Sequence, residues 1–147
     1  MPTVESKVVV ESPLEKVYAL SRDIERFPQF MDDVEEVTIL EQSRERQVSR
    51  WVGNVRELRR VIRWTEEDFW NDEAHTCVFR QTEGDFTAYG GRWEFVPEGT
   101  GTRVTMTLDY EYNVPLVGAL IQNILKKKMQ ANIDAMLGAI KKKAEEG

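Results

Sequence analysis

The 147-residue sequence has few of the residues that build metal centres and disulfides. It contains one cysteine, Cys77, and one histidine, His75, so an intrachain disulfide and the usual zinc sites of several His and Cys ligands are excluded. Neither GxxxxGK[ST] nor GxGxxG occurs, which removes the phosphate-loop and dinucleotide-binding fingerprints. We therefore expect a chain that works without a metal ion or another cofactor.

Acidic residues outnumber basic ones, and long apolar runs are scarce. The 20 Lys and Arg residues against 26 Asp and Glu residues give a formal net charge of −6, which argues against nucleic acid as a partner. No uncharged apolar run approaches the roughly 20 residues of a membrane span, and the N-terminal residues lack the apolar segment of a signal peptide. The sequence predicts a cytoplasmic protein with one domain over residues 1–147.

The chain does contain one strand, a clear helix start and then a series of strands. Residues 4–10 alternate as a half-buried strand, and Ser12-Pro13-Leu14-Glu15 has the pattern of a capping box with Ser12 as the N-cap. A second short helix is expected from Ile24 to Phe27, ending at Pro28. Alternation and turn residues predict strands near 34–42, 46–54, 57–69, 73–83, 86–96 and 102–113. After Pro115, an apolar stripe of helical period predicts a long helix to about Lys143.

This order predicts an α+β fold in which a curved seven-stranded antiparallel sheet wraps around one long C-terminal helix. A helix about 10 Å wide cannot fill the concave face of such a sheet, so either large side chains or a guest molecule must occupy the gap. Polar residues on the strands favour a guest, because apolar walls with a few inward polar groups are typical of small-molecule sites.

Arginines are the polar residues whose direction matters most. In the strand at 57–69, Arg60 lies on one face with Trp64, whereas Arg63 lies on the other, so the covered face carries at least one arginine. The strands at 46–54 and 73–83 show the same ambiguity at Arg50 and Arg80. The alternative is that these arginines lie near strand ends, extend to solvent and pair with acidic residues.

Several motifs resemble those of a known superfamily. Glu11-Ser12-Pro13-Leu14-Glu15-Lys16-Val17-Tyr18 resembles its "x-A-P-x-E-x-V-[WY]" motif, and Asp23-Ile24-Glu25-Arg26-Phe27-Pro28-Gln29-Phe30 resembles "D-x-E-R-x-P-x-[FW]". Gly91-Arg92-Trp93-Glu94-Phe95 and the helix after Pro115 add to the likeness. On these residues the chain resembles the START-like (SRPBCC, helix-grip) superfamily, and within it the polyketide cyclase/dehydrase and ubiquinone-binding lipid-transfer group.

The resemblance implies a helix-grip fold with a hydrophobic tunnel that holds lipids, quinones or polyketides. It also implies an alternative function, a metal-free polyketide aromatase/cyclase or dehydratase that would use Arg63 or Arg80 with Thr65, Tyr89 and Trp64 on a poly-β-ketone. Where such enzymes carry an arginine after their tryptophan and serine, this sequence reads Arg63-Trp64-Thr65-Glu66-Glu67, so no catalytic role is assigned.

Binding or transfer of a hydrophobic small molecule is therefore the leading hypothesis. For several of the large side chains, ordinary core packing is the other interpretation. The candidate ligand-binding residues are Phe27, Phe30, Arg63, Trp64, Arg80, Tyr89, Trp93, Met106, Tyr110, Ile121, Leu125 and Met129.

Three further groups have weaker claims to a function. His75 and Cys77 share a predicted strand face, but no glycine elbow or helix N-terminus is present to activate the thiol. The carboxylate pairs Asp32-Asp33, Glu35-Glu36 and Glu66-Glu67 are neighbours that point to opposite faces of a strand, so most are expected on the surface. The lysine runs at 126–128 and 141–143 either solvate the last helix or permit transient contact with a membrane or a ribosome.

Overall fold

The structure is a computed structural model that describes residues 2–55, 59–112 and 118–146. It contains a sheet, two α-helices and one 3₁₀ helix. The elements are β1 (Thr3–Val10), α1 (Leu14–Arg22), the 3₁₀ helix η1 (Ile24–Gln29), β2 (Val34–Gln42), β3 (Arg46–Val55), β4 (Arg60–Asn71), β5 (Thr76–Gly84), β6 (Ala88–Glu98), β7 (Gly101–Glu111) and α2 (Ala119–Glu145).

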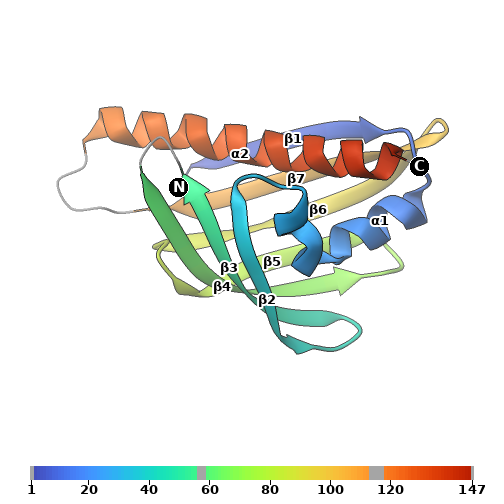
Figure 1. The fold of residues 1–147 in the computed structure, drawn as a ribbon, viewed down its shortest axis with the longest axis horizontal. Helices are drawn as coiled ribbons and strands as arrows, with labels where there is room; N and C mark the ends of the chain where they lie inside the picture. The colour runs from blue at the N-terminus through green and yellow to red at the C-terminus, as the bar shows by residue number, and fades with distance from the viewer. Residues whose placement is uncertain (1, 56–58, 113–117, 147) are drawn as a thin grey trace.

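The seven strands form one antiparallel sheet in the order β1-β7-β6-β5-β4-β3-β2. Figure 1 shows α2 running along the curved sheet beside β1 and β7, with α1 next to its C-terminal end. This arrangement confirms the predicted α+β helix-grip architecture with two short helices after the first strand.

The predicted strand boundaries that fall on described residues lie within three residues of the observed ones, and β2 matches at both ends. The alternation is clearest in β7, where every second residue is buried against the core. The predicted strand start at 57–58, the strand end at 113 and the helix start after Pro115 lie outside the described residues.

The predicted capping box at the start of α1 is wrong. The helix begins at Leu14 with Pro13 in the N-cap position, and no side chain caps it. Glu15 does not return to the Ser12 backbone, because its carboxylate contacts His75 Nε2 at 2.7 Å. Ser12 is buried, and its carbonyl accepts a hydrogen bond from Thr102 Oγ1 at 2.9 Å. A tertiary contact therefore holds this helix start in place of the local motif.

The second short helix is longer than expected. Pro28 lies inside η1, whereas we predicted that the helix would end before it. The turn is closed by the backbone N–H groups of Phe30 and Met31, which both donate to the Phe27 carbonyl. In this short 3₁₀ helix the missing Pro28 N–H removes one hydrogen bond and leaves the closing hydrogen bonds intact.

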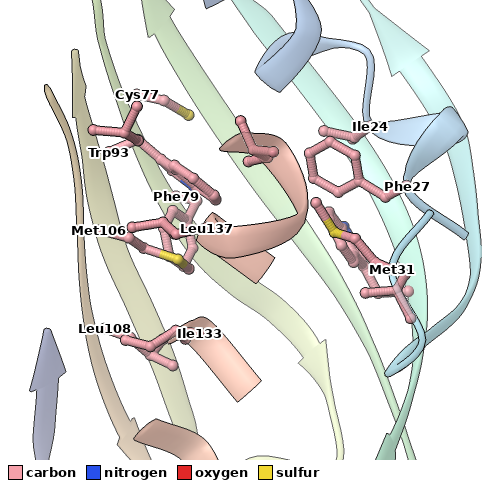
Figure 2. Close-up of a cluster of buried hydrophobic side chains, with 14 of the residues drawn as sticks. Ile24, Phe27, Met31, Cys77, Phe79, Trp93, Met106, Leu108, Ile133 and Leu137 are labelled. Carbon is pink, nitrogen blue, oxygen red and sulfur yellow. The ribbon is translucent and has the colours of Figure 1, made fainter. Parts of the chain in front are cut away.

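The core lies between the concave face of the sheet and the helices. Figure 2 shows Ile24, Phe27 and Met31 on one side of α2, with Phe79, Trp93, Met106 and Leu108 of the sheet on the other. The predicted apolar stripe of α2 is buried at Leu125, Met129, Ile133, Leu137 and Ile140. No helix in residues 2–55, 59–112 or 118–146 has the length and apolar content needed to cross a membrane.

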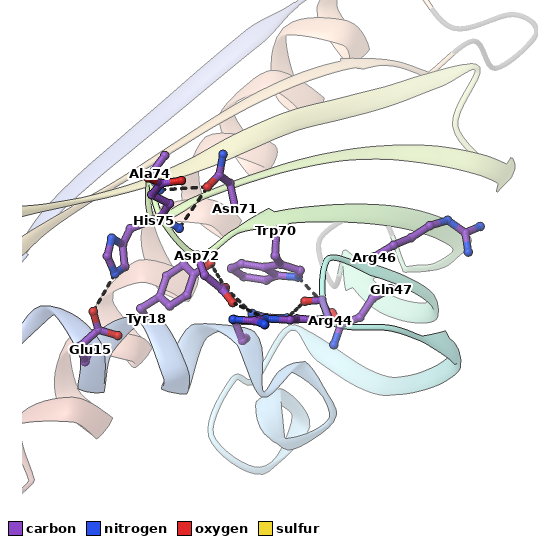
Figure 3. A network of polar contacts seen from close by, with 12 residues as sticks. Glu15, Tyr18, Arg44, Arg46, Gln47, Trp70, Asn71, Asp72, Ala74 and His75 are labelled. Atoms are coloured by element: carbon purple, nitrogen blue, oxygen red, sulfur yellow. Dashed lines mark hydrogen bonds and ion pairs between the residues drawn. The ribbon is translucent and has the colours of Figure 1, made fainter.

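A polar network ties α1 to the turn between β4 and β5 (Figure 3). The Tyr18 hydroxyl donates to Asp72 Oδ1 at 2.7 Å, and Arg22 Nη1 donates to the same oxygen at 2.6 Å. The hydrogen bond from Tyr18 is the main reason why the pKa of Asp72 lies below its ordinary value of 3.8. These contacts fix α1 over one end of the sheet.

We expect Tyr18→Phe to lower the melting temperature by roughly 2–4 °C at neutral pH, because Asp72 loses one of its two short charged hydrogen bonds. Thermal unfolding followed by circular dichroism measures this change. Tyr112→Phe is the matched control, because among the described residues the Tyr112 hydroxyl accepts one long bond of 3.3 Å, from the exposed Arg60. Equal losses in the two variants would contradict a specific role for the Tyr18–Asp72 bond.

Candidate ligand-binding site

A cavity of about 370 Å³ opens between the sheet, the segment after η1 and α2. This volume falls within the range of roughly 300–1,000 Å³ that small-molecule sites occupy. Most of its walls are apolar or aromatic, with Asp32, Asp33, Asn54 and Asn132 as the polar members. The main lining residues are Phe30, Met31, Val34, Trp51, Gly53, Val55, Ile62, Trp64, Phe86, Tyr89, Met106, Leu108, Met129, Ile133, Ala135, Met136 and Ala139.

Aromatic side chains form the wall on the sheet side. Trp51 and Trp64 face each other across the β3–β4 pair and stack with ring centroids 5.7 Å apart and planes 10° apart. Trp64 also lies against Gly53, where an added Cβ would come within 3.2 Å of its ring. The ring centroid of Tyr89, on β6, lies 4.6 Å from that of Phe86 and 5.2 Å from that of Trp64. The wall is therefore built from aromatic residues of three strands and the segment between β5 and β6.

A second, smaller pocket of about 30 Å³ lies beside the cavity. The two spaces share Trp51, Tyr89, Met106 and Met136 as lining residues. The small pocket has its own polar lining residues, which are Glu66, Asp68 and Ser21.

Glu66 and Asp68 lie two residues apart on β4, so both side chains point to the inner face of the sheet. They are 5% and 3% exposed, and Trp64 Nε1 donates to Glu66 Oε1 at 2.8 Å. Burial, followed by the negative charge of Asp68, holds the pKa of Glu66 well above its ordinary value of 4.5. Burial also raises the pKa of Asp68, although the hydrogen bond with Glu66 acts in the opposite direction. The pair therefore retains a proton where isolated carboxyl groups would both be charged.

The carboxyl pair also affects its neighbours. Burial raises the pKa of the Tyr89 hydroxyl, and the charges of Glu66 and Asp68 raise it further. The pKa of the Cys77 thiol is raised by burial first and by the same two carboxyl groups next. Cys77 is 1% exposed and His75 lies in a turn against Glu15, so the structure does not assemble a nucleophilic pair from them.

The ten apolar and aromatic residues predicted for the site separate into three groups. The large cavity is lined by Phe30, Trp64, Tyr89, Met106 and Met129. The small pocket is lined by Phe27, Tyr89, Trp93 and Met106. Tyr110 and Leu125 are buried in the core without lining either space, and Ile121 is 40% exposed at the start of α2.

The two predicted arginines do not lie in the cavity, contrary to expectation. Arg63 is exposed on the outer face of β4. Arg80 is exposed on the outer face of β5, where Nη2 contacts Glu67 Oε1 at 2.9 Å. Alternation places Arg60 on the inner face of β4. Arg60 is the first residue of the strand, however, and its side chain is exposed. The arginines therefore follow the alternative in which they extend to solvent and pair with acids.

The sequence did not predict the acidic residues of the small pocket, because we compared Glu66 with its sequence neighbour Glu67 and not with Asp68. Glu67 faces outward between Arg46 and Arg80, whereas Asp68 shares the inner face with Glu66. The signal in the sequence is the alternation Trp64-x-Glu66-x-Asp68-x-Trp70, which places two carboxyl groups between two tryptophans on one strand face. Within the described ranges, no group of three or more His, Cys, Asp or Glu residues is placed to hold a metal ion.

Comparison with known families gives one match, which covers residues 10–137. The matching family is described as polyketide cyclase / dehydrase and lipid transport. The chain belongs to this family. No curated protein sequence matches the chain.

Several solved structures share the fold of this chain. The protein TTHA0849 from Thermus thermophilus is 36% identical with a TM-score of 0.92, and the alignment covers 97% of each chain. The Zhui aromatase/cyclase from Streptomyces sp. R1128 is 22% identical with a TM-score of 0.89, over 98% of this chain and 93% of the other. A START superfamily protein from Mycobacterium smegmatis is 20% identical with a TM-score of 0.82, over 98% and 97%. The last two likenesses concern the fold alone.

Proposed function

We propose that the protein binds, and transfers between sites, a hydrophobic small molecule such as a lipid, a quinone or a polyketide. The observation that carries this proposal is the cavity of about 370 Å³ between the sheet and α2. Its walls are mainly apolar and aromatic, so they stabilise a guest by removing its apolar surface from water. The polar residues that line it are Asp32, Asp33, Asn54 and Asn132.

Membership of a family described by lipid transport supports the same function. The alternative function, cyclisation or dehydration of a polyketide, remains compatible with the family description. However, its proposed residues Arg63, Thr65 and Arg80 lie on the outer face of the sheet, and only Trp64 and Tyr89 line the cavity. Among the described residues, those that line the cavity do not favour catalysis over binding.

Transfer requires that the guest leave the cavity for an acceptor. The exposed Lys126 and Lys127 give the α2 surface a local positive charge on a protein of net charge −6. We propose that these lysines make transient contact with an anionic membrane surface during transfer.

Naphthalene is a suitable uncharged probe for the cavity. We expect it to bind with one-to-one stoichiometry and a dissociation constant of roughly 10–100 µM in a calorimetric titration, because a small apolar guest gains only a limited affinity per atom. Solvent extraction and mass spectrometry of the purified protein should recover an apolar guest. A flat titration together with an extract free of apolar compounds would overturn the proposed function.

A further inference from the structure

The inner end of the cavity carries polar groups that the packing of the protein does not use. Asp68 Oδ1 is buried and accepts no hydrogen bond from an N–H or hydroxyl group of the described residues. The hydroxyl of Ser21, on α1, is also buried and without a partner among them. Both residues line the same pocket of about 30 Å³. Buried polar atoms are rarely left without partners, so each of these groups points to an occupant.

We propose that this pocket binds the hydroxyl group of the guest, so that the protein selects an alcohol or phenol carried on an apolar body. This inference rests on the proposed function, because the apolar body occupies the larger cavity. The two spaces share Trp51, Tyr89, Met106 and Met136 as walls and are therefore neighbours, so we place the apolar body of the guest in the larger space and its hydroxyl group in the smaller one.

The hydrogen-bonding capacity of the pocket matches a hydroxyl group better than an ammonium group. A hydroxyl donates one hydrogen bond and accepts others. It can donate to Asp68 Oδ1 and accept from the Ser21 hydroxyl. An ammonium group has three donors and no acceptor, so it would leave the hydrogen-bond donor of the unpartnered Ser21 hydroxyl unused.

The neighbouring carboxyl group does not block this interaction. Glu66 shares a proton with Asp68, and each carboxylate oxygen can accept two hydrogen bonds. Asp68 therefore keeps free acceptor capacity while Glu66 donates to it. The residues opposite on β3, Gln47 and Ser49, accept hydrogen bonds from the Trp70 and Trp51 indoles, at 3.1 and 2.9 Å.

A water molecule is the competing occupant, since about 30 Å³ is enough to hold one. The two possibilities differ in their effect on guest selection. A pocket that only stores water gives no preference for a hydroxylated guest, whereas a recognition pocket does.

The test compares naphthalene with 2-naphthol in calorimetric titrations of the full chain. We expect 2-naphthol to bind at least 10-fold more tightly, because a hydroxyl group placed in the cavity without a partner would weaken binding instead. Asp68→Asn should reduce the preference to about 3-fold, and Asp68→Val should abolish it. Ser21→Ala should weaken 2-naphthol binding about 3-fold and leave naphthalene binding unchanged.

Glu67→Gln is the matched control, because it changes the adjacent carboxylate on the outer face of the same strand. Its ratio of affinities should equal that of the wild type. If naphthalene binds but 2-naphthol binds no better, the recognition pocket is overturned and the binding function stands. Tighter binding of 2-(aminomethyl)naphthalene than of 2-naphthol would overturn the hydroxyl assignment. If no naphthalene compound binds, both the function and this inference fail.

Discussion

The Glu66→Gln variant is expected to be more stable than the wild type at pH 8, by on the order of 2 kcal/mol, and equally stable near pH 4. The folded-state pKa of Glu66 lies above its ordinary value, so the folded protein retains this proton after the unfolded chain has released it. The stability contributed by Glu66 is therefore complete below the ordinary pKa and decreases as the pH rises towards the folded-state pKa. Glutamine keeps the shape of the protonated side chain and removes this loss.

Urea unfolding between pH 4 and pH 8 measures the difference, and the adjacent Glu67→Gln variant supplies a control of opposite sign. The hydrogen bonds from Arg46 and Arg80 hold the pKa of Glu67 below its ordinary value of 4.5. Glu67→Gln should therefore be less stable than the wild type at neutral pH, and the difference should shrink as the pH falls. If Glu66→Gln were no more stable at pH 8, Glu66 would be charged and compensated in the folded protein.

The fold follows from the sequence because its signals are local and repeated. Val104, Met106, Leu108 and Tyr110 alternate with polar residues along β7, and each buries its side chain against the core. The α2 stripe has the same property at helical spacing. The mistaken details are helix ends, where Glu15 contacts His75 in preference to the backbone that the capping motif predicts. Contacts between distant segments decide such ends, and the sequence does not display those contacts.

The cavity was predicted from the shape of the sheet, but its polar end was not. Successive residues of β4 point to opposite faces, and both faces contain charged residues. The sequence of β4 alone therefore does not show which face is the inner one. Pairing with β3 resolves it, because Trp51 opposes Trp64 and Ser49 opposes Glu66 in the register. The tryptophans are the larger apolar side chains, and their burial carries Glu66 and Asp68 inward with them. Arg63, on the opposite face of β4, then faces solvent.

Filling the cavity should abolish ligand binding without unfolding the protein. Ala139 of α2 lines the large cavity and is partly buried. In Ala139→Trp, an indole side chain can occupy part of the space of about 370 Å³, so we expect at least a 10-fold loss of naphthalene affinity. Insertion into a filled core would cost about 1–3 kcal/mol. Here the space is available, so the melting temperature should stay near that of the wild type.

Ala131→Trp is the control for this experiment, because Ala131 lies on the same helix, is exposed and does not line the cavity. Calorimetric titration of both variants with naphthalene, together with their thermal unfolding, separates occupancy of the cavity from a general effect of tryptophan. Unchanged affinity in Ala139→Trp with a retained melting temperature would mean that naphthalene binds elsewhere. A large loss of stability in Ala139→Trp alone would mean that side chains already fill the space beside α2. Either result would remove the physical basis for a guest between the sheet and this helix.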